Sequence, residues 1–201
     1  LPTLEGGGSI ACALDQSNQM VYYNVGKDLY RYDIQTKTFE KYAVGNPFNG
    51  NYPRMELKDD TLYISNGTTL YTVDIKTNEV LNTYQIEGFI NNSSGGDIAF
   101  GTDGVLYLAC FSGLYKFTSF SDDKAYIIRV SAENFPHKLT SMAIDRQNRI
   151  FVGTSDSNSK LIEMSTADGS FEIVKEYDFT INDLTAWKCE QAELNPDDND
   201  G

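Results

Sequence analysis

The sequence is poor in the residues from which metal and acid–base sites are usually built. Among its 201 residues there is one histidine, His137, and the three cysteines, Cys12, Cys110 and Cys189, form no CxxC pair. Without such spacing or a histidine cluster, the sequence argues against a zinc site of the usual Cys/His kind. An odd number of cysteines indicates a free thiol or a bridge to a residue elsewhere. We expect Cys110, which follows an apolar run, to be a buried thiol, and Cys189 to be the better candidate for a disulfide.

Long apolar runs and positive charges are also scarce. No segment is apolar over the length that a bilayer-spanning helix needs. The 29 acidic residues outnumber the 16 basic ones, which gives a formal net charge of −13. A surface this acidic repels phosphate backbones and anionic lipids, so we expect neither nucleic acid nor a membrane as partner, and solubility is its simplest role. The sequence begins at Leu1, and we expect it to be a mature or excised piece of a longer protein.

What the sequence does contain is an internal repeat of about 43 residues. Three strand-like segments, rich in Tyr, Phe, Val and Ile, recur in the same order. The first segment is predicted at 11–15, 54–58, 97–101, 141–145 and 183–187. The second reads Met20–Tyr23, Leu62–Ser65, Leu106–Ala109 and Ile150–Gly153, and the third Leu29–Asp33, Leu70–Asp74, Leu114–Thr118 and Leu161–Ser165. Asp, Asn and Gly, which favour turns, separate the segments, and a fourth strand follows each third one.

This period is typical of a β-propeller, in which every blade is a four-stranded antiparallel sheet. We predict an all-β partial propeller over residues 1–189, with four blades of about 43 residues and the inner strand of a fifth at Asp183–Trp187. No segment has a capped 3.6-residue apolar period, so no helix is expected. Since nothing after Trp187 completes the fifth blade, we expect segments outside this chain to complete the ring.

The aligned segments resemble the propeller regions of large bacterial cell-surface, adhesin-like proteins. More distantly, they are similar to NHL-like, streptogramin-lyase-like and gluconolactonase-like propellers. The stretches Gly96–Ala109, Ser112–Lys116, Leu139–Asp145 and Ile181–Cys189 carry this resemblance. It implies a propeller fold and an extracellular or cell-surface location. It leaves the function open, because many propellers share these motifs.

The acidic tail, residues 190–201, has two interpretations. It resembles the opening of a thrombospondin type 3-like calcium-binding repeat, in which Asp197, Asp198 and Asp200 would supply oxygen ligands for Ca²⁺. Alternatively, it is a disordered acidic linker. Calcium is the only cofactor that the sequence indicates.

The first residues of the inner strands are the main candidates for a binding site. Symmetry brings Arg54, Asp97, Ser141 and Asp183, with Asn182 beside the last, to one mouth of the central channel, where we expect a ligand to bind. Two carboxylates and a guanidinium there would hold a polar ligand, and Asp97 with Asp183 would hold a cation such as Ca²⁺. The alternative is that both aspartates accept hydrogen bonds from strand amides and anchor one blade to the next.

Two loops carry the remaining candidates. Phe48 and Tyr52, with Tyr42 nearby, would stack on a sugar or grip a protein, unless they pack between blades. His137 lies in the loop before the fourth blade. The streptogramin-lyase resemblance implies a histidine base in the channel, whereas an exposed loop histidine is more commonly just solvated. No second base or positioned nucleophile accompanies it.

We therefore expect a non-catalytic, extracellular or cell-surface module for binding or display, whose partner is a protein or a polysaccharide. The alternative is a lactonase- or lyase-type propeller enzyme with a divalent metal at the channel mouth. No residue is assigned a catalytic role.

Overall fold

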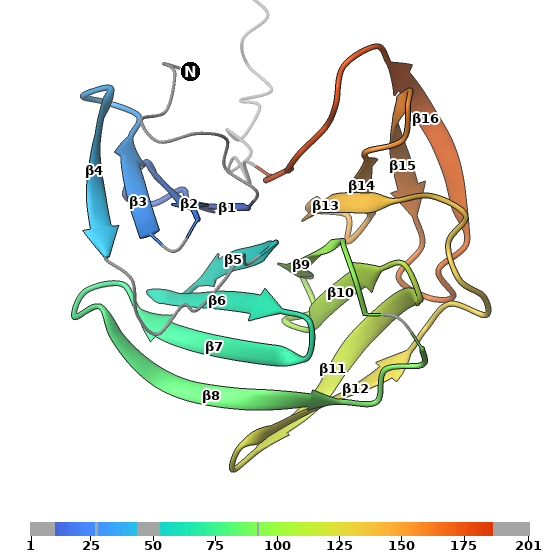
Figure 1. The fold of residues 1–201 in the computed structure, drawn as a ribbon, viewed down its shortest axis with the longest axis horizontal. Helices are drawn as coiled ribbons and strands as arrows, with labels where there is room; N and C mark the ends of the chain where they lie inside the picture. The colour runs from blue at the N-terminus through green and yellow to red at the C-terminus, as the bar shows by residue number, and fades with distance from the viewer. Residues whose placement is uncertain (1–10, 27, 44–52, 92, 187–201) are drawn as a thin grey trace, which may run out of the picture.

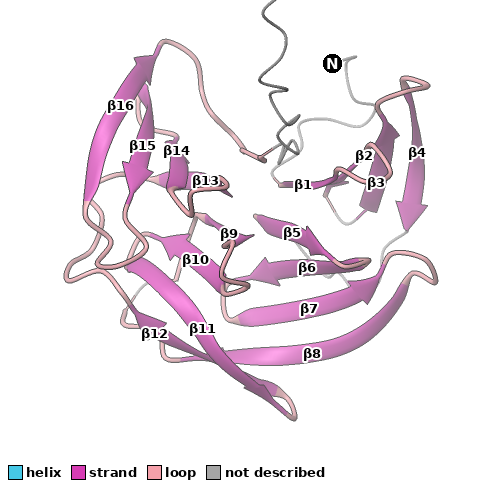
Figure 2. Cartoon of the chain, turned by 180° about the vertical axis from the view of Figure 1, so that it is seen from behind, coloured by secondary structure: helices cyan, strands magenta, loops and turns pink. Residues whose placement is uncertain are grey.

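The computed structural model describes residues 11–26, 28–43, 53–91 and 93–186. Within these ranges it contains sixteen β-strands and no helix (Figure 2). This part of the chain accordingly has no helix long and apolar enough to cross a bilayer. The strands form four blades around a common centre, and an open sector separates the first blade from the fourth (Figure 1). The predicted all-β propeller with four blades is confirmed.

Each blade is an antiparallel meander that runs from the centre outwards. Blade 1 comprises β1 (Cys12–Asp15), β2 (Met20–Val25), β3 (Asp28–Asp33) and β4 (Thr38–Ala43). Blade 2 comprises β5 (Arg54–Lys58), β6 (Thr61–Asn66), β7 (Thr69–Asp74) and β8 (Glu79–Glu87). Blade 3 comprises β9 (Asp97–Phe100), β10 (Leu106–Cys110), β11 (Gly113–Ser121) and β12 (Lys124–Arg129). Blade 4 comprises β13 (Leu139–Ile144), β14 (Ile150–Thr154), β15 (Ser159–Met164) and β16 (Phe171–Tyr177).

Turn chemistry explains why the outer strands reverse where they do. In the β3–β4 turn, Asp33 Oδ1 accepts hydrogen bonds from the backbone N–H groups of Gln35 and Thr36, at 2.8 and 2.9 Å. Asp74 repeats this arrangement in the β7–β8 turn. An aspartate that satisfies the amides of the next residues replaces a strand ladder with a turn. The spacing of these aspartates therefore fixes the length of the third strand.

Blades 2 and 3 are joined at their outer edges, which the repeat did not predict. β8 and β12 pair in parallel, with Gln85 opposite Lys124, so that eight strands form one continuous sheet. The pairing is possible because β8 is nine residues long and continues past Gln85, the last residue that it pairs with β7. Lys124 and Glu87 form an ion pair of 3.3 Å across this seam.

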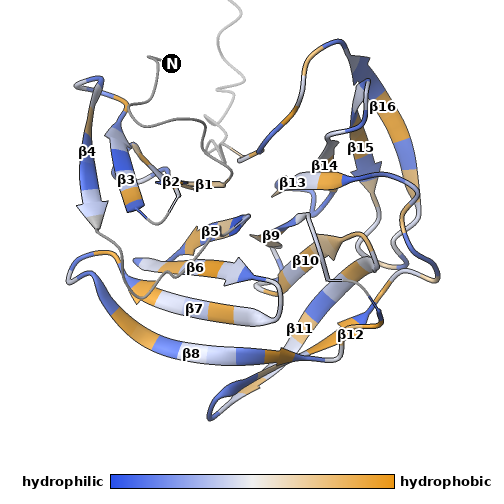
Figure 3. Cartoon of the chain, in the orientation of Figure 1, coloured by the Kyte–Doolittle hydropathy of each residue, from blue (hydrophilic) through white to orange (hydrophobic). Residues whose placement is uncertain are grey.

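Each blade has a front face, defined here as the face toward the following blade. In blades 1 to 3 this face carries an aromatic residue on the second strand and a leucine on the third. The aromatic residues are Tyr22, Tyr63 and Tyr107, and the leucines are Leu29, Leu70 and Leu114. The leucines are at most 1% exposed, and each belongs to a hydrophobic cluster shared with the next blade. Each stabilises its junction by about 1.5–3 kcal/mol, and Figure 3 shows such apolar bands on the strands of every blade.

The structure corrects two details of the predicted alignment. Ala13 pairs with Tyr22, whereas its equivalent Glu56 pairs with Tyr63, so the second strand of blade 1 is shifted by one residue. The shift arises because the β1–β2 turn is longer than the corresponding turn of blade 2. No strand forms at residues 178–186, so the described part of the segment Asp183–Trp187 is not a strand, and Trp187 lies outside the described residues.

Candidate functional site

The aspartate at the start of β9 lies at the axis and connects three blades. Asp97 is 1% exposed. Its carboxyl group accepts hydrogen bonds from the backbone N–H of Met55 in β5 and of Met142 in β13, both at 3.1 Å. It also accepts one from its own neighbour Ile98, at 2.8 Å. One buried carboxyl group thereby satisfies amides of blades 2, 3 and 4 and anchors these blades to one another.

Asp183 makes the matching connection to blade 1. Its carboxylate accepts a hydrogen bond from the backbone N–H of Cys12. The segment 178–186, which carries Asp183, is fixed to blade 4 by Thr140, whose hydroxyl donates to the carbonyl of Ile181 at 2.6 Å. The chain therefore returns from the outermost strand of blade 4 to the axis, and there it binds the inner strand of blade 1.

The two carboxyl groups influence each other's pKa. Burial, followed by the charge of Asp183, raises the pKa of Asp97 well above its usual range. Burial also raises the pKa of Asp183, to about 6, although its interactions with Asp97 and Cys12 act in the opposite direction. Asp97 is therefore the carboxyl group that holds its proton more strongly. Burial and the charge of Asp183 raise the pKa of the Cys12 thiol, so Cys12 is not a nucleophile at neutral pH.

Arg54, the first residue of β5, binds backbone carbonyls rather than an open channel. Its guanidinium donates to the carbonyl of Gly95 from Nε, at 3.2 Å, and from Nη2, at 3.0 Å. It also donates to the carbonyls of Gly67, at 3.0 Å, and of Ser93. These bonds fasten β5 to the loop that precedes β9 and to the β6–β7 turn. Burial lowers the pKa of Arg54, and the surrounding carbonyl dipoles compensate its charge.

Most of the residues predicted at the mouth of the central channel do lie at the axis, but their side chains are buried there. Arg54, Asp97 and Ser141 are 0%, 1% and 0% exposed. Asn182 is exposed, and Asp183 beside it is partly exposed. This geometry supports the alternative in which the aspartates anchor the blades.

The predicted metal ligands are not assembled into a cage in the described part of the chain. No group of three or more His, Cys, Asp or Glu side chains there is arranged to hold a metal ion. Asp97 and Asp183 are already used as acceptors of backbone hydrogen bonds. Asp197, Asp198 and Asp200 lie outside the described residues, so calcium binding by the tail stays a prediction.

A small cavity of about 90 Å³ lies between the inner strands, and all four blades contribute to its wall. Its polar groups are Gln16, Glu56 and Thr185, and the rest of its wall is mainly aliphatic. Glu56 is the third residue of the repeat segment 54–58, a position that holds alanine in the segments of the other three blades. One carboxylate, one amide and one hydroxyl are too few for a calcium cage. The volume accommodates about three water molecules.

The single histidine lies away from the axis. His137 Nδ1 is 2.8 Å from Asp156 Oδ2, and the side chain of His137 is 19% exposed. The ring centroid of His137 is 6.3 Å from that of Phe171, a residue of the outermost strand of blade 4. His137 is therefore a partly buried, paired side chain near the rim, and not the solvated loop residue or the channel base that the sequence allowed.

Tyr42 and Cys110 are two of the predicted aromatic and cysteine residues that lie within the described part of the chain. Tyr42 packs between blades 1 and 2, since its hydroxyl donates to the carbonyl of Ile75 and its ring meets the edge of Tyr22 at 5.5 Å. Phe48 and Tyr52 lie outside the described residues, as does Cys189. Cys110 is a buried thiol, as predicted.

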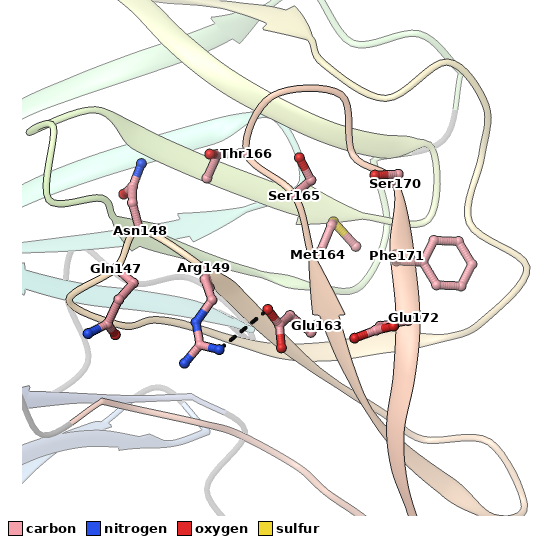
Figure 4. Close-up of a pocket in the computed structure, with 10 residues that line it drawn as sticks. All are labelled: Gln147, Asn148, Arg149, Glu163, Met164, Ser165, Thr166, Ser170, Phe171 and Glu172. Atoms are coloured by element: carbon pink, nitrogen blue, oxygen red, sulfur yellow. Dashed lines mark ion pairs between the residues drawn. The ribbon is translucent and has the colours of Figure 1, made fainter.

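A larger hollow, about 500 Å³, lies at the edge of blade 4 and was not predicted. In Figure 4, Arg149 and Glu163 point toward each other, with Nη1 and Oε1 3.6 Å apart, whereas the ring of Phe171 points away from them. Arg149 is also paired with Asp145 at 2.7 Å and lies over the ring of Phe151. The other walls are mainly polar and comprise Gln147, Asn148, Met164, Ser165, Thr166, Ser170 and Glu172. The volume is within the range of small-molecule sites.

Sequence reasoning missed this hollow because its residues are typical of turns and of the strands that flank them. Asp145–Asn148 and Thr166–Gly169 are turn signals in the sequence, and they do serve as turns. The hollow forms because the β13–β14 turn and the β15–β16 turn lie next to each other in space. A local sequence pattern does not predict that two separate turns will be neighbours.

Comparisons with known proteins find no matching family model and no matching curated protein. Solved structures do match. The chain superposes on a protein of unknown function from Bacteroides thetaiotaomicron with a TM-score of 0.67 and 14% identity, over 92% of this chain and 55% of that one. The virginiamycin B lyase of Staphylococcus aureus matches with a TM-score of 0.54 and 15% identity, over 87% and 57% of the two chains. This chain has the fold of the lyase-like propellers.

A third match is to an extracellular domain. The extracellular domain of BT4673 from Bacteroides thetaiotaomicron matches with a TM-score of 0.55 and 16% identity, over 87% of this chain and 23% of that one. At these identities the lyase-like propeller fold is shared, and nothing further follows from it. The chain spans between 23% and 57% of the length of the three matched chains.

Proposed function

We propose that this propeller is a non-catalytic extracellular module that binds a protein or polysaccharide partner. The arrangement of the axis carries the proposal. Arg54, Asp97 and Ser141 are buried there, and the first two are hydrogen-bonded to the backbone of neighbouring elements. The remaining cavity, about 90 Å³, is too small for a sugar chain or a peptide. Recognition is therefore assigned to the outer surface of the blades.

The hollow on blade 4 is the surface that we propose for this contact. It presents the guanidinium of Arg149 and the carboxylates of Glu163 and Glu172, surrounded by amide and hydroxyl groups. Planar charged groups of this kind hydrogen-bond the hydroxyls of a saccharide or the polar groups of a protein surface. The likeness to an extracellular domain supports placing the module outside the cell.

The alternative function is a lyase- or lactonase-type enzyme. The shared fold of the virginiamycin B lyase and the presence of Glu56 in the axial cavity favour it. The Staphylococcus aureus lyase is catalytically inactive when one of its histidines is replaced by alanine. Here the single histidine is paired with Asp156 near the outermost strand of blade 4. That difference favours the binding module.

Two measurements separate these functions. The chain is incubated with quinupristin, and separately with a gluconolactone, each with Mg²⁺ and with chelator, and loss of intact compound is followed by mass spectrometry. We expect the same rate as in buffer. Turnover that Glu56→Gln abolishes would establish the enzyme and refute the binding module as the main function.

The binding arm uses retention on a panel of immobilised polysaccharides and extracellular proteins. We expect retention on at least one of them, and a loss of about tenfold or more when Arg149→Gln and Glu163→Gln are combined. Arg31→Gln is the matched control, because Arg31 is an exposed arginine of blade 1 that pairs with Glu40. Equal losses in both variants would refute the hollow as the contact surface.

A further inference from the structure

Blade 4 has a front face with the pattern of the other three blades, but no described blade packs on it. Phe151 pairs with Ala143, the third residue of the repeat segment 141–145, and so occupies the position of the aromatic residue in blades 1 to 3. Leu161 pairs with Gly153 and occupies the position of the three buried leucines. The front face of blade 4 therefore repeats the chemistry by which every other blade contacts its successor.

Leu161 differs from its counterparts in exposure. Leu29, Leu70 and Leu114 are at most 1% exposed, whereas Leu161 is partly exposed, as is Phe151 beside it. Over Phe151 lies the guanidinium of Arg149, 5.3 Å from the ring centroid, and not an apolar side chain of a fifth blade. In the described part of the chain, no further blade packs on these two apolar side chains.

The segment after β16 supplies a second, independent observation. Asp183 accepts the backbone N–H of Cys12, which is the contact that Asp97 makes with Met142 of the following blade. Thr185 and Ala186 are the third and fourth residues of the predicted segment 183–187, and they line the axial cavity. The third and fourth residues of the segments 54–58, 97–101 and 141–145 line it too; they are Glu56 with Leu57, Ala99 with Phe100, and Ala143 with Ile144. Residues 183–186 thus lie where an inner strand lies, although no second strand pairs with them in the described part of the chain.

We infer that the front face of blade 4, marked by Phe151 and Leu161, docks one further propeller blade, whose innermost strand is residues 183–186. Its occupant is a β-sheet with an aliphatic face, because aliphatic side chains cover the equivalent leucines elsewhere. Leu29 is packed with Met55, Ile64 and Val73, and Leu114 with Met142, Val152 and Ile162. The inference rests on continuity with three junctions of the same chain, since blades of a repeat protein contact their neighbours through equivalent faces.

This surface shares the front face of blade 4 with the hollow, because Glu163 pairs with Phe151 and Arg149 lies over the Phe151 ring. The docked blade would therefore lie against Arg149 and Glu163 and form one wall of the contact surface proposed above. The two proposals are separable, since one concerns retention on a partner and the other concerns stability of the propeller itself.

The repeat provides its own probe for the test. Since Asp183 matches Asp97, a copy of residues 101–130 inserted between Ala186 and Trp187 supplies strands two to four of a fifth blade. We expect the thermal midpoint to rise by at least about 5 °C, and residues 183–186 to become protected in hydrogen exchange. A scrambled insert of the same composition should do neither. Leu161→Glu in the chain with the insert should abolish the rise.

The chain without the insert gives a second measurement that does not depend on the insert folding. There Leu161→Glu should move the thermal midpoint by less than about 2 °C, because Leu161 is partly exposed. The matched control Leu114→Glu, at the equivalent buried position of blade 3, should unfold the chain. Unfolding by Leu161→Glu here, no rise with the insert, or a rise that survives Leu161→Glu would each overturn the inference. A dimer of the unaltered chain that Leu161→Glu dissociates would overturn it in favour of a second copy.

Discussion

Asp183 accepts a hydrogen bond from the backbone N–H of Cys12, as Asp97 does from that of Met55. In both contacts the donor is the second residue of one repeat unit and the acceptor is the first residue of another. Because Asp97 also accepts from Met142, the two aspartates together contact all four blades. Each carboxyl group influences the pKa of the other, so their protonation is linked to the arrangement of the blades.

The first prediction is that stability falls between pH 5 and pH 8. The pKa of both aspartates is raised above 3.8, that of Asp183 to about 6. A carboxyl group whose pKa is raised by folding contributes stability below its unfolded pKa, and this contribution is lost as the pH rises through its folded pKa. Since Asp183 is partly exposed, we expect a loss of about 1–2 kcal/mol in the free energy of unfolding, measured with urea at both pH values.

Asp183→Asn is the control for that titration. It removes an ionisable group and keeps a side chain that can accept the Cys12 amide, so the difference between pH 5 and pH 8 should shrink. Asp33 and Asp145 act in the opposite sense, because hydrogen bonds lower the pKa of each, and their contribution is lost only as the pH falls below about 4. A pH dependence that survives Asp183→Asn would contradict the assignment.

A second prediction concerns Arg54. Its truncation to alanine leaves a buried cavity and deprives the carbonyls of Gly95 and Gly67 of their donor. We expect a loss of about 3–5 kcal/mol in the free energy of unfolding. Arg31→Ala, at an exposed arginine 38% accessible, should cost less than about 1 kcal/mol. Similar costs for the two variants would mean that Arg54 does not fasten the blades.

The blades could be predicted from the sequence because their determinants are local. The turn aspartates Asp33 and Asp74 and the recurring leucines set the period, and both act within a few residues. The parallel seam between Gln85 and Lys124 could not be predicted, because it depends on how far β8 extends past β7. The predicted register was wrong in blade 1 for a related reason, since a longer turn between β1 and β2 moves Tyr22 by one position relative to the repeat.

For the site, the sequence identified the right residues but not their environment. Arg54, Asp97 and Ser141 were placed together by symmetry, and they do lie on equivalent inner-strand positions. Their burial depends on how closely the inner strands approach, which is set by packing of all four blades and not by any one segment. The same limitation hid the hollow around Arg149 and Glu163, which two separate turns create.

A third prediction uses a glycine whose replacement is sterically forbidden. Gly96, just before β9, has φ +72°, and a Cβ atom there would lie 1.7 Å from the carbonyl oxygen of Ala109. Gly96→Ala should therefore cost at least about 3 kcal/mol in the free energy of unfolding, measured by urea titration. Gly26→Ala is the matched control, because Gly26 has φ +60° but open space around it, and it should cost about 1 kcal/mol. Equal costs would show that the approach to Ala109 is looser than the structure has it.

The last prediction decides between calcium binding and anchoring at the axis. Asp97→Asn keeps the size of the side chain but turns an amide nitrogen toward one of the two backbone donors, Met55 or Met142, that now bond to carboxyl oxygens. A donor facing a donor in a buried place should lower the free energy of unfolding by about 1–3 kcal/mol. Because every contact involved is to the protein backbone, the loss should be the same in calcium and in chelator. Thermal melts of both proteins under both conditions measure it. If instead the unaltered chain melts higher in calcium, and Asp97→Asn removes that rise while leaving the chelator value unchanged, then the aspartates hold a cation, and their hydrogen bonds to the strand amides are secondary.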